Sequence, residues 1–254
     1  MTSSGAPFSN AARNLRQLGS SPMSWAAASV ILVIQLGVSL AGGPGEQPLW
    51  NLFRTFGLST DGILSGKVWQ LLTYGLLHGG WVHAGVNSLF VLLIGSRIEH
   101  MAGRPALLRV LCLGIVAGGV VHLLFTSHRE APSLLVGISG GCLALLLLLT
   151  TLSPQSRMMP LPVSGRNLGV GILVAELLMA LMDKELDIPG FSQAGEWLTG
   201  RGFGGLVELG HACHFGGGLA GWLYGRWLLR PRVTLQRLRR DRERREAGES
   251  RRLS

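Results

Sequence analysis

Successive apolar segments, each close to the length that crosses a lipid bilayer, are the feature that most constrains this chain. A transmembrane helix needs about 20 mostly apolar residues. Six segments approach that length: Trp25–Ala41, Val82–Ile98, Pro105–Phe125, Leu134–Leu152, Leu168–Met182 and Gly204–Leu229. Only 15% of the 254 residues are charged, against about 25% in soluble domains. We therefore expect an all-α membrane protein with six transmembrane helices, in one domain over residues 25–229.

The charges outside these segments predict the orientation in the membrane. The stretch 226–254 has eleven arginines against four acidic residues, and the first 24 residues contain Arg13 and Arg16 with no acidic residue. Because positive residues accumulate on the cytoplasmic side, we expect both tails, 1–24 and 230–254, to be cytoplasmic in a multi-pass protein of the plasma (inner) membrane. The arginine-rich C-terminal tail is expected to bind anionic lipid headgroups and not nucleic acid.

The first apolar segment has two interpretations. SLAGG at residues 39–43 resembles a signal-peptidase site, but the long polar leader and Trp25 favour an uncleaved anchor. The outer segment that follows is long and contains several aromatic residues, so we expect short amphipathic helices in the headgroup layer.

Polar side chains inside apolar segments are costly in lipid and indicate functional sites. They gather in three places: His78, His83 and Asn87; Ser139; and Glu208, His211 and His214. In the predicted topology, segments two, four and six all enter from the outer side, so these groups should meet in one layer. The motif GISG at 137–140 has a structural interpretation, since small residues let helices pack closely. The convergence of the three groups favours Ser139 as a nucleophile.

A serine hydroxyl becomes an effective nucleophile when a base accepts its proton, and imidazole is the usual base. Spacing alone leaves His211 and His214 open as candidates, because residues three apart share a helix face. A ridge of small residues shares the face of His214: Gly217, Gly221 and Gly225. That ridge should press against the Gly140–Gly141 side of segment four. We therefore predict His214 as the base and His211 as a packing histidine.

Acyl chemistry also needs donors for a developing oxyanion. His83 and Asn87 lie one helical turn apart on one face of segment two. We predict that they supply those donors together with the backbone N–H of Ser139 at the start of its helix.

Motifs on alternate segments carry a family resemblance. They are HAGVN at 83–87, GISG at 137–140, HFGGGLAG at 214–221, and the GxxxExxxG pattern of Gly95, Glu99 and Gly103. From about residue 25 to 229 the chain resembles a rhomboid intramembrane serine protease.

The resemblance implies a six-helix bundle without a cofactor, cleaving transmembrane segments of membrane proteins near small residues. It implies a Ser–His dyad without a third carboxylate, in which Ser139 is the nucleophile and His214 the base and then the acid. The oxyanion site would come from His83, Asn87 and the Ser139 amide. Structural roles then fall to Gly137, Gly140, Gly217, Gly221 and Glu99.

The sequence departs from the family pattern in two places. Gln70 follows Trp69 where an arginine is frequent, so anchoring of the first loop is expected to differ. Leu143 stands four residues after the serine, where many members place a tyrosine on the histidine. The carboxylate of Glu176, in the middle of segment five, is costly in lipid. We expect it to be either protonated or paired with a neighbouring helix, with a structural rather than a catalytic role.

Two other classes of protein remain open. A catalytically inactive relative would bind transmembrane clients without cleaving them, although such proteins lack the serine or the histidine. A membrane metal protein would use His78, His83, His211 and His214, but no HExxH-type helix is present. We predict no metal site.

Overall fold

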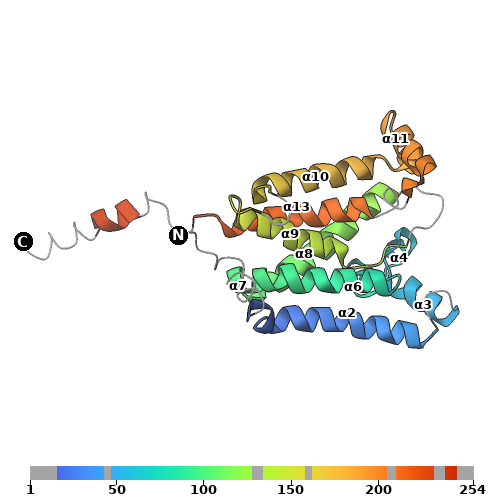
Figure 1. Cartoon of the computed structure of the whole chain (residues 1–254), viewed down its shortest axis with the longest axis horizontal. Helices are drawn as coiled ribbons and strands as arrows, with labels where there is room; N and C mark the ends of the chain where they lie inside the picture. The colour runs from blue at the N-terminus through green and yellow to red at the C-terminus, as the bar shows by residue number, and fades with distance from the viewer. Residues whose placement is uncertain are drawn as a thin grey trace, which may run out of the picture.

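The computed structural model describes residues 16–42, 47–127, 134–157, 162–204, 210–231 and 238–244. These residues form helices, with isolated β-bridges at Leu58–Leu135 and Arg157–Ser164. The long helices lie side by side in one bundle, and long helices that follow one another in the chain run in opposite directions (Figure 1). Its helices are α2 (Pro22–Leu40), α3 (Gln47–Phe56), α4 (Thr60–Leu64), α5 (Gln70–Thr73), α6 (Trp81–Phe90), α7 (Ser96–Ala102), α8 (Arg104–Thr126), α9 (Ser139–Leu152), α10 (Gly165–Leu181), α11 (Phe191–Leu198) and α13 (His211–Leu228).

Among the described residues, three helical stretches are long and apolar enough to cross a bilayer: Pro22–Leu40, Trp81–Ala102 and Arg104–Thr126. The second joins α6 to α7 through a π-helical turn, Val91–Gly95. Helix α9 is apolar but shorter. Outward faces of the long helices are apolar, with Val33, Val82 and Leu124 each more than 60% exposed, which is stable in lipid and unfavourable in water. The chain is a multi-pass membrane protein.

Two helices begin later than the sequence suggested. Segment four was expected from Leu134, but α9 begins at Ser139. Gly137 has a φ of +113°, which interrupts a helix, and the main chain before it pairs elsewhere: Leu135 exchanges hydrogen bonds with Leu58. Segment six was expected from Gly204, but α13 begins at His211. Glu208 lies outside the described residues.

Helix α9 is enclosed by α8, α10 and α13. The close approach of α9 and α13 depends on glycines: a Cβ on Gly217 would collide with the backbone of Gly140, and one on Gly221 with the backbone of Ala144. Small residues here remove the spacing that side chains would impose. This contact brings the first turns of α9 and α13 together.

Short helices α3, α4 and α5 fill the segment after α2, which confirms the prediction of short helices there. Gln70 is fully buried and binds across this segment: its amide nitrogen donates to the carbonyl of Arg54 at 3.0 Å, and its oxygen accepts from the N–H of Ser59 at 3.2 Å. Trp69 donates to the carbonyl of Thr55 at 3.0 Å. The glutamine thus anchors the loop by neutral hydrogen bonds.

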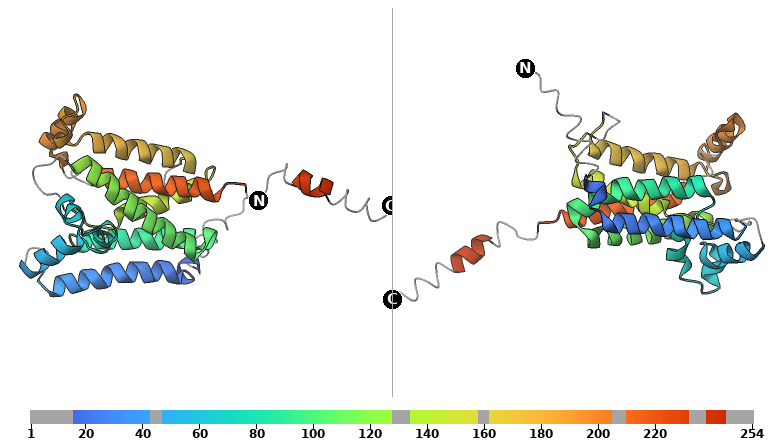
Figure 2. Two further views of the ribbon diagram at one scale, coloured as in Figure 1. Left: turned by 180° about the vertical axis from the view of Figure 1, so that it is seen from behind. Right: turned by 60° about the horizontal axis from the view of Figure 1, so that its bottom comes forward.

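The bundle has two distinct ends. Helices α3, α4 and α11 lie at one end, together with the starts of α9 and α13; α7, the start of α2 and the finish of α13 lie at the other (Figures 1 and 2). Chain direction therefore alternates through the bundle. The first described residues and residues 229–231 leave it at the same end, as an even number of crossings requires.

Candidate active site

Ser139 and His214 meet across the contact between α9 and α13. The Nε2 atom of His214 lies 2.9 Å from the Oγ atom of Ser139. Both residues stand in the first turn of their helices, and the side chain of His214 is 15% exposed. The glycine contacts hold the two first turns at this separation. The pair has the distance that proton transfer from a serine to an imidazole requires.

Glu176 of α10 lies behind the histidine. Its Oε2 atom is 3.3 Å from Nδ1 of His214 and 2.6 Å from Nδ1 of His211. The two imidazole rings stand nearly perpendicular, with centroids 5.9 Å apart. The sequence did not identify a partner for the Glu176 carboxylate. In the structure its partners are His211 and His214 of α13. The resemblance implied a dyad without a carboxylate, and this arrangement differs from it.

His83 and Asn87 of α6 face the turn that precedes Ser139. A Cβ on Gly137 would stand 2.6 Å from Nε2 of His83 and 3.7 Å from Nδ2 of Asn87. Gly137 therefore lets both side chains approach the main chain next to the serine. The Nδ2 atom of Asn87 is buried and has no hydrogen-bond partner among the residues that the structure describes. A buried donor without a partner suits a ligand atom that arrives with substrate.

His78 supports His83 from the loop before α6. The two rings make an edge contact with centroids 4.9 Å apart. Burial, with a smaller contribution from His83, lowers the pKa of His78 to about 4, so this ring is neutral near pH 7. Its contact with His83 is a packing contact between rings.

A cavity of about 440 Å³ adjoins the cluster at the α11 end of the bundle. Its walls include His211, Gly210, His122, Met179 and Glu196. His211 is the member of the cluster that lines this cavity, whereas Ser139 and His214 are not among the residues of its walls.

Within the described part of the chain, Glu176, His211 and His214 have ligand-type atoms that all lie within 4.8 Å of one another. Such a set resembles the three protein ligands of a catalytic zinc site. However, the nitrogen–oxygen distances of 2.6 and 3.3 Å are those of hydrogen bonds. The other nitrogen of His214 is engaged with Ser139. The geometry is that of a hydrogen-bonded relay, and the four-histidine set does not assemble, because His78 and His83 contact each other instead.

Comparisons with known proteins place the chain in a family. The profile of the Rhomboid domain matches residues 65–231. Human Rhomboid-related protein 3 is 36% identical over 82 residues, which cover 32% of this chain and 19% of the relative. Rhomboid protease GluP of Bacillus subtilis is 29% identical over 123 residues, covering 47% of this chain and 23% of the relative. RHOMBOID-like protein 7 of Arabidopsis thaliana is 32% identical over 113 residues, covering 42% of this chain and 36% of the relative.

The matched region spans less than half of each of these relatives. The domain match, in contrast, covers more than half of the present chain and contains every segment that forms the Ser139 cluster. The protein therefore belongs to the rhomboid family and is a homologue of rhomboid proteases.

Proposed function

We propose that the protein is an intramembrane serine endopeptidase that cleaves transmembrane segments of other membrane proteins. The observation that carries the proposal is the 2.9 Å contact between Ser139 Oγ and His214 Nε2, made inside a bundle whose outer faces are apolar. A peptide bond reaches this pair only from within or beside the membrane. The class of substrate therefore follows from the location of the nucleophile.

The chemistry proceeds in two halves. In the first, Ser139 Oγ attacks the peptide carbonyl while His214 Nε2 accepts its proton, and the same nitrogen then protonates the leaving amine, which gives an acyl-enzyme. In the second, His214 takes a proton from a water molecule that attacks the ester, and it then returns that proton to Ser139 Oγ as the C–O bond breaks and the carboxylic acid product leaves. Each half passes through a tetrahedral oxyanion, for which the donors are Asn87 Nδ2, His83 and the Ser139 N–H, which is unused at the helix start.

The membrane arrangement belongs to the same proposal. We assign six spans to residues 25–229, with α9, α10 and α13 as the shorter crossings and with the ends 1–24 and 230–254 in the cytoplasm. The plasma membrane is the proposed location, and the arginine-rich tail lies on anionic headgroups. Ser139 then opens toward the outer side, where water is available.

Cleavage of a single-span substrate in liposomes tests the function. Wild type should cut, Ser139→Ala should not, and Ser153→Ala, which changes the serine at the other end of α9, should cut as wild type does. Folded wild type that binds the substrate without cleaving it would favour the alternative, an inactive client-binding relative.

A further inference from the structure

The contact between Ser139 and His214 determines where the protons of His214 stand. For Nε2 to accept the serine proton, it must be unprotonated in the resting state. A neutral imidazole then carries its proton on Nδ1, which becomes a donor. That donor sits in a largely buried ring, where an N–H without an acceptor is costly. Its acceptor is Glu176 Oε2, at 3.3 Å.

Glu176 is placed by the inner stripe of α10. Gly169 and Ala180, seven residues before it and four after, are buried, whereas Val170 and Val174 on the other face are about half exposed. The carboxylate therefore reaches toward α13 at mid-helix. A carboxylate in a membrane helix is expensive unless paired, and Glu176 pairs with two histidines of α13.

His211, three residues before His214, contacts the same oxygen of Glu176. Its Nδ1 lies 2.6 Å from Oε2, closer than that of His214. Residues 211 and 214 share one helix face, so one carboxylate oxygen accepts from both rings. His211 thereby fixes Glu176, and Glu176 fixes the orientation and tautomer of His214.

The same carboxylate matters when the proton moves. After His214 takes the serine proton, it is an imidazolium inside a bundle with little water, and an adjacent negative charge stabilises it. From this geometry we propose that Glu176 is a positioning residue that completes a Ser139–His214–Glu176 relay. The proposal rests on the proposed function and departs from the dyad that the family resemblance implied.

Substitution by glutamine separates a positioning role from a structural one. The amide of Glu176→Gln keeps the shape but can donate to Nδ1 of His214, which selects the tautomer with its proton on Nε2. That tautomer cannot accept from Ser139. We expect kcat of Glu176→Gln to fall about 100-fold or more, with KM little changed. Its loss in kcat should be at least as large as that of Glu176→Ala. The melting temperature of Glu176→Gln should be closer to that of wild type than the melting temperature of Glu176→Ala is.

Nitrogen-15 NMR of histidine-labelled protein in micelles provides a readout that does not depend on turnover. The His214 signals are assigned by their loss in His214→Ala. We expect a proton on Nδ1 in wild type and on Nε2 in Glu176→Gln. Asp61→Asn, an exposed carboxylate change on α4 away from the cluster, should leave tautomer and rate unchanged, and Glu176→Asp should recover part of the rate.

The outcomes distinguish the two proposals. A wild type that cleaves, with Glu176→Gln within about threefold of it, overturns the relay and leaves the proposed function standing. A folded wild type that neither cleaves the substrate nor reacts at Ser139 with a fluorophosphonate probe overturns the proposed function. In that case the tautomer still decides the relay: a switch in Glu176→Gln supports it, and an unchanged His214 tautomer contradicts it.

Discussion

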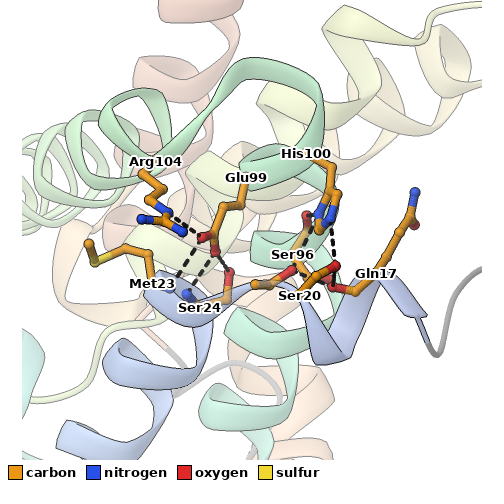
Figure 3. A network of polar contacts seen from close by, with 9 residues as sticks. Gln17, Ser20, Met23, Ser24, Ser96, Glu99, His100 and Arg104 are labelled. Carbon is orange, nitrogen blue, oxygen red and sulfur yellow. Dashed lines mark hydrogen bonds and ion pairs between the residues drawn. The ribbon is translucent and has the colours of Figure 1, made fainter.

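Two largely enclosed carboxylates, Glu99 with a side chain 5% exposed and Glu176 with one 19% exposed, use their oxygens differently. Glu99 of α7 accepts from the N–H groups of Met23 and Ser24 at 3.2 and 3.0 Å, from the Ser24 hydroxyl at 2.9 Å, and pairs with Arg104 at 3.3 Å (Figure 3). The resemblance implied a structural role for Glu99, and the carboxylate holds the first turn of α2, where free N–H groups favour a negative charge. Glu176, in contrast, binds two imidazoles.

The surroundings of the two carboxylates differ as well. Around Glu99, His100 is bonded to the carbonyl of Ser96 and lies near the hydroxyls of Ser20 and Ser21 (Figure 3). Near Ser139, by contrast, the amide nitrogen of Asn87 has no partner among the described residues. A network with its hydrogen bonds made stabilises the fold, whereas one with a buried donor left open is arranged for a group that arrives later. The comparison predicts stability effects at one end and rate effects at the other.

The largest effect should come from His214. His214→Ala removes the base, and we expect cleavage to fall at least about 10⁴-fold with little change in melting temperature. His211→Ala is the matched control, because it removes the neighbouring ring and leaves Ser139 its base; a loss of about tenfold is expected. Initial rates on the liposome substrate measure both. If His211→Ala were the more damaging, the base would have been assigned to the wrong histidine.

Asn87→Ala should come next. Removal of one oxyanion donor costs about 10²–10³-fold in kcat, while stability should hardly change because the amide nitrogen has no hydrogen-bond partner within the described part of the chain. Single-turnover cleavage and thermal unfolding, measured together, test this. A large drop in melting temperature with an unchanged rate would place Asn87 with the structural network instead.

At the other end, Glu99→Ala should destabilise the protein by about 2–3 kcal/mol, because the start of α2 loses charge-assisted hydrogen bonds. The cleavage rate per folded molecule should be unchanged. Denaturant unfolding in mixed micelles, with Glu99→Gln as the milder control, measures the difference. A rate loss without a loss of stability would break the proposed division between the two ends.

The smallest effect is expected at His100. His100→Ala removes partly exposed contacts to serine hydroxyls, which contribute about 1 kcal/mol. Unfolding of the double variant Glu99→Ala/His100→Ala should show whether the two contributions add; a coupling near zero would mean that the network of Figure 3 does not act as one unit.

Much of the site followed from spacing alone. The glycine ridge after His214 predicted which face of α13 meets α9, and the position of Ser139 near a helix start followed from its motif. The partner of Glu176 did not follow, because the inward face of α10 depends on its packing against α13. The hydrogen bonds of Gln70 could not be predicted either, because they join it to main-chain groups of a loop, and the hydrophobic pattern does not predict the path of a loop. The start of α9 was misjudged because apolar residues before Gly137 look like helix yet pair with the loop.

Labelling with a fluorophosphonate probe, followed by mass spectrometry of the adduct, tests most directly that His214 activates Ser139. Wild type should carry one adduct, on Ser139, and His214→Ala should label at least about 100-fold more slowly. Equal labelling of the two proteins, or an adduct on another serine in wild type, would contradict the assignment of Ser139 and His214 as a catalytic pair.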